Sequence, residues 1–183
     1  MVEVKFFLTG RPGSGKSTTL LRCIELLRGL GFTVGGIATP EIRKGRRRVG
    51  FSVVDLASGR RALLAGTEVA SRFRVGRYGV DLAGFESVAL PALDYAERSC
   101  DVVCIDEIGR MEFFSKPFKR RVEELIQGEK PMIAVIHRNY VEMYRRWGKV
   151  FHISIENRER LPRLIVTRLK ESLRREVRHL KQG

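Results

Sequence analysis

One stretch near the start of the sequence has the residue types and spacing of a phosphate-binding loop. It matches the pattern G-x-x-x-x-G-K-[ST] in full. Its members are Gly10, Arg11, Pro12, Gly13, Ser14, Gly15, Lys16 and Ser17, and Thr18 follows them. Glycines let backbone N–H groups wrap around phosphates, and the N-terminus of the helix that follows adds a favourable dipole. Lys16 is expected to reach the β- and γ-phosphates and Ser17 to place its hydroxyl on Mg²⁺, so residues 10–18 are predicted to bind a nucleotide.

A second chemical group stands where the apolar run 102–105 ends in Asp106 and Glu107. A carboxylate at the end of a buried strand can hold the shell of a magnesium ion, so Asp106 is predicted to contribute to the metal site through water. Glu107 is predicted to be the general base that polarises a water molecule against the γ-phosphate. Hydrolysis also develops charge on the γ-phosphoryl group, and an arginine often stabilises it. Arg110 is the first candidate, which makes Lys16, Glu107 and Arg110 the predicted catalytic residues.

Three further groups of residues have a functional and a structural interpretation. They are the arginines Arg43 and Arg48, the pair His137 and Arg138, and the aromatic pair Tyr144 and Trp147. The two arginines are alternatives to Arg110 or ordinary solvated cations. The histidine pair follows an apolar run and either senses the γ-phosphate or caps a helix. The aromatic pair could stack on a base, but packing in the core is favoured.

The composition indicates a soluble globular protein whose partners carry negative charge. The chain has 183 residues, 43% of them hydrophobic, and 35 Lys+Arg against 21 Asp+Glu give a net charge of +14. This length predicts one domain over 1–183. The basic run 43–48 and the basic stretch 158–181 lack an accompanying nucleic-acid-binding motif, so we expect weak, non-specific nucleic-acid binding at most. We also expect a cytoplasmic monomer with reduced cysteines, without a signal peptide or a membrane span.

Alternating apolar and amphipathic segments predict the elements that position these residues. Strands are expected at 4–9, 33–38, 101–105, 132–136 and 150–155. Helices are expected at 16–30, 87–98, 141–146, after Ser115 and from Leu161 onward. A hairpin of 49–56 and 61–64, with a third strand within 73–80, interrupts the alternation. The predicted fold is a three-layer α/β phosphate-loop domain, RecA-like and ASCE-type, with a mostly parallel sheet and a β-hairpin insertion.

Four segments in this order give the chain a resemblance to a known family. They are GRPGSGKSTT, GGIATPEIRKGRRRVGFSVVDLASGRR, RVGRYGVDLAGFESVALPAL and VVCIDEIGRME. Together they resemble the small phosphate-loop nucleoside-triphosphatases of thermophiles, which are similar to the cancer-related nucleoside-triphosphatase of animals. The resemblance covers the chain to about His137 and implies magnesium-dependent hydrolysis of several nucleoside triphosphates to the diphosphate and phosphate. Arg110 departs from the family, in which Lys is commoner, and we expect only a change of geometry there.

The sequence also leaves two other functions open. A small-molecule or polynucleotide kinase would share the loop but pass the phosphoryl group to a hydroxyl, whereas Glu107 suits the activation of water. A nucleotide-switched module that binds RNA or a protein is the other alternative. The late Asn/Thr-Lys-x-Asp element of guanine-specific switches is missing from the sequence, which argues against a GTPase and against strict choice of base.

Overall fold

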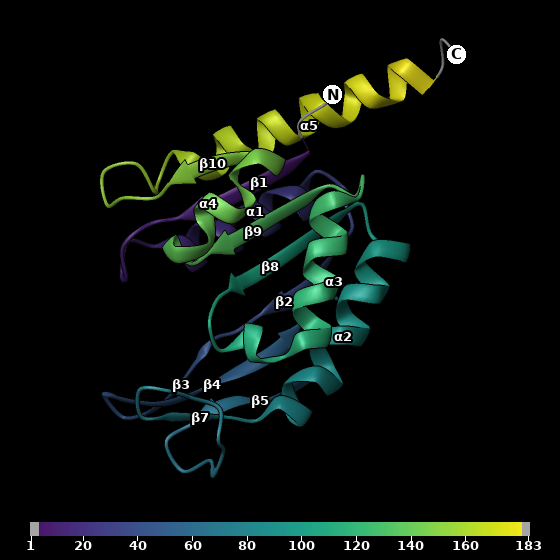
Figure 1. The fold of residues 1–183 in the computed structure, drawn as a ribbon. Helices are drawn as coiled ribbons and strands as arrows, with labels where there is room; N and C mark the ends of the chain where they lie inside the picture. The colour runs from purple at the N-terminus through teal and green to yellow at the C-terminus, as the bar shows by residue number, and fades with distance from the viewer. Residues whose placement is uncertain (1–3, 181–183) are drawn as a thin grey trace.

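The computed structural model describes residues 4–180, and a single mixed sheet of ten strands runs through it (Figure 1). The parallel part has the order β10-β1-β9-β8-β2. These strands are Lys149–His152, Lys5–Thr9, Met132–Ile136, Val102–Ile108 and Val34–Ala38. The phosphate loop follows β1 and the acidic pair lies near the end of β8. Because β9 separates β1 from β8, these two strands are not neighbours. This order confirms the predicted ASCE-type fold.

The antiparallel part of the sheet is larger than the single predicted hairpin. Its strands are β3 (Glu41–Lys44), β4 (Arg47–Asp55), β5 (Arg61–Gly66), β6 (Arg74–Val75) and β7 (Tyr78–Val80). β4 pairs with β2, and the sheet continues through β5 and β7 to β6, while β3 pairs with β4. β3 was not predicted because its run of charged residues has no apolar alternation. The predicted strand 73–80 is a hairpin instead, because it turns at Gly76, which has φ +55°.

Helices cover both faces of the sheet, as Figure 1 shows. Helices α1 (Lys16–Gly29) and α5 (Leu161–Leu180) pack on one face, and α2 (Leu82–Ser99) and α3 (Lys116–Gln127) pack on the other. Alternation along β1 supplies both cores: the side chain of Phe6 joins the α1/α5 core and that of Phe7 joins the α2/α3 core. This two-sided burial explains why the central strands read as continuous apolar runs.

Cap residues set the start of two of these helices. The Asp81 side chain accepts a hydrogen bond from the Gly84 N–H at 2.9 Å, so α2 begins several residues before its predicted start at 87. The Ser115 hydroxyl accepts one from the Phe118 N–H at 3.1 Å, which confirms the predicted cap of α3. Four shorter helical segments lie between the main elements of the described residues: η1 (Glu112–Phe114), η2 (Arg138–Tyr140), α4 (Val141–Tyr144) and η3 (Arg145–Trp147). Within residues 4–180, no helix is both long and apolar enough to cross a membrane.

Gly36 shows how closely the backbones of β2 and β8 approach each other. Its φ is +115°, and a Cβ at this position would lie 1.9 Å from the carbonyl oxygen of Cys104. Only glycine fits such a contact. Because β8 carries the acidic pair at its end, this contact helps to fix that strand against its neighbour.

Candidate active site

The phosphate loop occupies residues 10–15, between the end of β1 and the start of α1. Gly13 and Gly15 have φ values of +76° and +99°, which other residues rarely adopt. The Ser14 N–H donates to the Arg11 carbonyl oxygen at 3.1 Å, so the loop curls back on itself before the helix begins. The first N–H groups of α1 have no partner within the helix and form the positive end of its dipole. The predicted loop–helix geometry of an anion site is therefore present.

Lys16 lies folded against this loop and close to the acidic residues. Its Nζ donates hydrogen bonds to the carbonyl oxygens of Gly10 and Arg11, both at 3.1 Å. Burial raises the pKa of both Asp106 and Glu107, and the positive charge of Lys16 partly opposes this rise. The tertiary structure thus brings the loop lysine and the acidic pair together, as the sequence predicts.

Asp106 is buried at the end of β8 and held from two sides. Thr39, just beyond β2, donates from its hydroxyl to the Asp106 carbonyl oxygen at 2.8 Å. Burial raises the pKa of the Asp106 carboxyl to about 6, while a hydrogen bond with the Ser17 side chain opposes the shift. Ser17 and Asp106 thus place two hard oxygen donors side by side. Mg²⁺ prefers oxygen ligands and keeps several waters beside substrate phosphates, so these residues fit the predicted metal.

Glu107 stands where the pairing of β8 with β9 is interrupted. The register shifts between Ile105 and Ile108, so the two acids fall outside the regular ladder. The Glu107 side chain is partly buried, and this burial raises its pKa above the ordinary value. A carboxylate with a raised pKa is a stronger base, which suits the role predicted for Glu107.

Glu112 is a buried acid beside Glu107 that sequence reasoning did not single out. A Cβ on Gly109 would lie 2.7 Å from Glu107 Oε1 and 2.9 Å from Glu112 Oε2, so the two carboxyl groups flank this glycine. Glu112 is 4% exposed, and burial raises its pKa well above the ordinary value, with the charges of Glu107 and Asp106 adding to the shift. In the sequence Glu112 is one more acid in a charged stretch. The only signal for it there is that it follows Gly109 by three residues, close behind the acidic pair.

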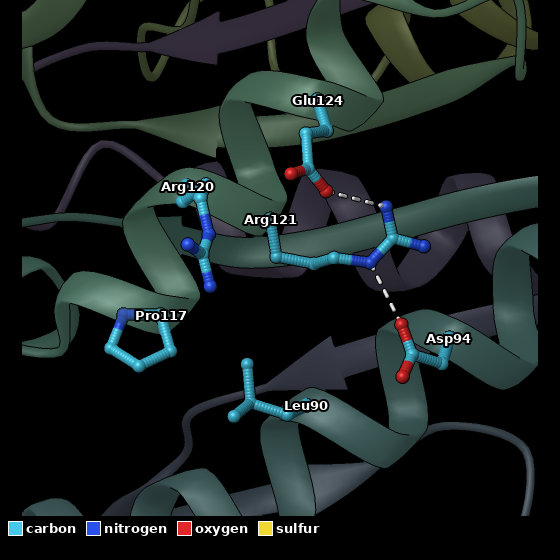
Figure 2. Close-up of a pocket in the computed structure, with 6 residues that line it drawn as sticks. All are labelled: Leu90, Asp94, Pro117, Arg120, Arg121 and Glu124. Carbon is cyan, nitrogen blue, oxygen red and sulfur yellow. Dashed lines mark hydrogen bonds and ion pairs between the residues drawn. The ribbon is translucent and has the colours of Figure 1, made fainter.

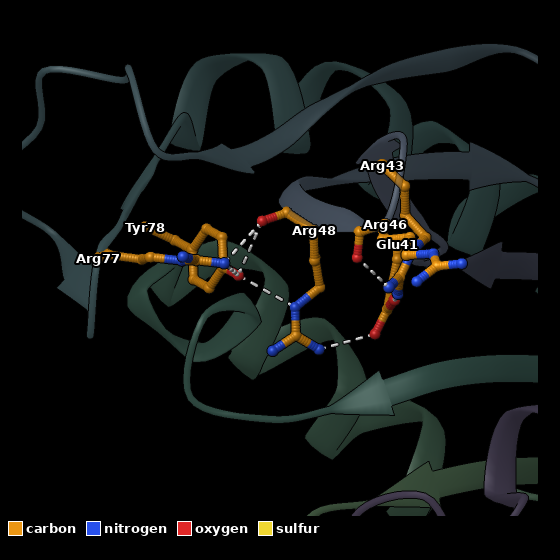
Figure 3. A network of polar contacts seen from close by, with 6 residues as sticks. All are labelled: Glu41, Arg43, Arg46, Arg48, Arg77 and Tyr78. Carbon is orange, nitrogen blue, oxygen red and sulfur yellow. Dashed lines mark hydrogen bonds and ion pairs between the residues drawn. The ribbon is translucent and has the colours of Figure 1, made fainter.

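Two of the candidate arginines belong to a polar network on the antiparallel part of the sheet (Figure 3). Glu41 pairs with both Arg43 and Arg48 at 2.7 Å. Arg48 also donates to the Tyr78 hydroxyl at 3.0 Å and lies over the rings of Phe51 and Tyr78. The structure therefore gives Arg48 a packing role. Arg110 is exposed and has no ion pair with a described residue, and its transition-state role stays a prediction, as does weak nucleic-acid binding.

His137 follows β9 at the edge of the sheet that carries the loop and the acids. The backbone N–H of His137 donates to the Ile108 carbonyl oxygen at 3.0 Å. Its ring Nδ1 accepts from the Asn139 backbone N–H at 3.3 Å, which is a capping contact. Burial and the charges of Arg138 and Lys16 lower the pKa of His137. Both interpretations of this residue therefore remain, because it caps a helical turn and lies near Lys16.

Tyr144 and a surface pocket are the remaining features of note. Tyr144 is buried in the α2/α3 core, where its hydroxyl donates to Glu123 at 3.3 Å, which favours the packing interpretation.

A pocket on the outer side of α2 and α3 is drawn in Figure 2. There Arg121 pairs with Asp94 at 2.8 Å and Glu124 at 3.3 Å, and none of the predicted site residues lines this pocket.

Comparison with known proteins agrees with the fold and with the resemblance seen in the sequence. The sequence profile of the family described as NTPase matches residues 5–166. The chain is 45% identical over 160 residues to a protein named nucleoside-triphosphatase THEP1 from Methanothermobacter thermautotrophicus, covering 86% of this chain and 91% of that protein. It is 37% identical over 171 residues to the protein of that name from Methanocaldococcus jannaschii, covering 93% and 100%.

Two solved structures are similar to this one. The crystal structure of THEP1 from the hyperthermophile Aquifex aeolicus superposes with a TM-score of 0.79 at 30% identity, over 90% of this chain and 98% of that one. The solution structure of a human cancer-related nucleoside triphosphatase gives a TM-score of 0.78 at 37% identity, over 92% and 98%. Because the family profile matches most of the chain and the relatives from Methanothermobacter and Methanocaldococcus are 45% and 37% identical over most of it, the chain belongs to the NTPase family of nucleoside-triphosphatases.

Proposed function

We propose that this protein hydrolyses nucleoside triphosphates to the diphosphate and phosphate, with Mg²⁺, and with little discrimination between bases. The observation that carries the proposal is the meeting of Lys16, Asp106 and Glu107 at one edge of the sheet, beside the phosphate loop. The names of the relatives, which are nucleoside-triphosphatases, support the same reaction class.

The phosphate loop and Lys16 bind the triphosphate in this proposal. Backbone N–H groups of residues 10–18 cradle the phosphates at the N-terminus of α1. Lys16 exchanges its hydrogen bonds to the Gly10 and Arg11 carbonyl oxygens for bonds to phosphate oxygens, which carry full negative charge and are therefore better acceptors. Ser17 and, through water, Asp106 would hold Mg²⁺, which would supply positive charge that neutralises the phosphates.

Glu107 supplies the base for the chemical step. A water oxygen attacks the γ-phosphorus while its proton passes to the Glu107 carboxylate, and the bond from the γ-phosphorus to the bridging oxygen breaks to release the diphosphate. Partial burial raises the pKa of Glu107, so the carboxylate accepts this proton more readily than an exposed one would. Neither the binding of the triphosphate nor its hydrolysis uses the nucleobase, which is why broad nucleobase specificity is proposed.

Steady-state hydrolysis of ATP, GTP, CTP and UTP, with Mg²⁺ or with a chelator, tests the proposal. We expect activity to disappear on chelation and kcat/KM to vary modestly among the bases. A preference above roughly 100-fold for one base, about 2.7 kcal/mol, would contradict the broad specificity. Diphosphate formation that required an added hydroxyl acceptor, with the phosphoryl group recovered on that acceptor and not as free phosphate, would favour the kinase alternative instead.

A further inference from the structure

A further arginine, outside the candidates from the sequence, lies directly against the phosphate loop. Arg158 belongs to the segment between β10 and α5, far from the loop in the sequence. A Cβ on Gly15 would lie 2.9 Å from Arg158 Cδ and 3.5 Å from its Nη1. Gly15 immediately precedes Lys16 and stands at the start of α1, so the Arg158 side chain reaches the positive end of that helix.

The segment that carries Arg158 is fixed to the end of β1 by a set of hydrogen bonds. The Ile153 N–H donates to the Thr9 carbonyl oxygen at 2.7 Å. Asn157 then bridges the turn, since its Oδ1 accepts from the Ser154 N–H at 2.8 Å and its Nδ2 donates to the His152 carbonyl oxygen at 2.8 Å. The Arg158 N–H donates to the Ser154 carbonyl oxygen at 3.0 Å. These bonds end β10 at His152, earlier than predicted, and they aim Arg158 at the loop.

The guanidinium of Arg158 lacks a close acidic partner in the described part of the chain. Its one ion pair, from Nε to Glu159 Oε1, is long at 3.9 Å. Glu159 instead pairs with Arg22 at 2.7 Å through its other carboxylate oxygen. Arg121, by comparison, is held by several acids on α2 and α3. Arg158 therefore keeps its donors available beside an anion site.

We propose that the Arg158 guanidinium binds the phosphate chain of the nucleotide held by residues 10–18. The proposal rests on the phosphate site described under the proposed function. A guanidinium presents a planar fork of N–H donors that matches phosphate oxygens, and it stays charged at any physiological pH. Gly15 has no side chain, and this leaves room for the arginine to pass over the loop.

Binding of two ligands to four variants tests the inference. The ligands are Mg²⁺–ATP and inorganic tripolyphosphate with Mg²⁺, and the variants are Arg158→Ala, Arg158→Lys, Arg160→Ala and Lys16→Ala. Arg160 is the matched control, because it is exposed, lies two residues away and changes the net charge equally. Loss of a hydrogen bond to a charged group predicts that Arg158→Ala binds both ligands roughly 10- to 100-fold more weakly, with Arg158→Lys in between. Arg160→Ala should stay within about twofold of the parent.

Each other outcome overturns the inference. Parental affinity in Arg158→Ala, or an equal loss in Arg160→Ala, would show no specific contact. Weaker binding of ATP alone, with tripolyphosphate unaffected, would place the guanidinium on the base or ribose. A lower unfolding temperature of ligand-free Arg158→Ala, with Arg158→Lys binding as weakly, would assign it a structural role. Lys16→Ala separates the two proposals, since parental binding by that variant would remove the phosphate site itself.

Discussion

Replacing Glu107 by Gln separates hydrolysis from nucleotide binding. The substitution keeps the size of the side chain and removes its charge and basicity. In the structure the Glu107 carboxylate forms no hydrogen bond or ion pair with a described residue. Burial raises its pKa, and the charge of Lys16 only partly opposes that rise. The variant therefore breaks no contact that holds the fold, and its unfolding temperature is expected to match that of the parent.

The expected loss falls on the chemical step. General base catalysis contributes roughly 10²- to 10⁴-fold, so kcat should fall by that factor, about 2.7 to 5.5 kcal/mol of barrier. Affinity should stay the same or rise slightly, because a negative charge beside the triphosphate is removed. Lys16→Ala is the contrast, since its loss of a phosphate contact in both ground and transition states weakens binding as well.

Single-turnover hydrolysis and equilibrium binding of ATP by the same preparations measure both quantities. A Glu107→Gln variant with near-parental kcat would refute the assignment of Glu107 as the base, because another group would then position the water. A parallel drop in affinity and unfolding temperature would refute the argument from contacts, because Glu107 would then hold the fold together.

Two further predictions concern stability. Gly36→Ala should lower the free energy of unfolding by more than about 3 kcal/mol, since its Cβ would overlap the Cys104 carbonyl oxygen. The control Gly29→Ala, with open space around its Cα, should be neutral or stabilising. Denaturant titration measures both variants, and equal effects would contradict the close contact. Glu112→Gln should become increasingly more stable than the parent as pH rises above the ordinary carboxyl pKa of 4.5, because the unfolded chain ionises there while burial keeps the folded Glu112 protonated. A pH-independent difference between these two proteins would show that Glu112 is already charged in the fold.

The sequence by itself determined the features that depend on neighbouring residues. The phosphate loop is contiguous, and its glycines, lysine and serine have fixed roles wherever a strand enters and a helix leaves. The same holds for the central strands, which are apolar because helices cover both of their faces. The Ser115 cap is also local, since a side chain and an N–H three residues away form it.

Only the tertiary structure decided which distant side chains meet. Glu112 becomes a neighbour of Glu107 because the chain turns at Gly109 after β8, and its burial there is a property of the packed core. Arg158 reaches Gly15 because β10 pairs with β1, which no local pattern encodes. Arg48 is one of many arginines in the sequence, and only the fold sets Glu41 and Tyr78 beside it. In each instance the energy of a charged group depends on its burial and its partners, and both are set by strand pairing across long stretches of chain.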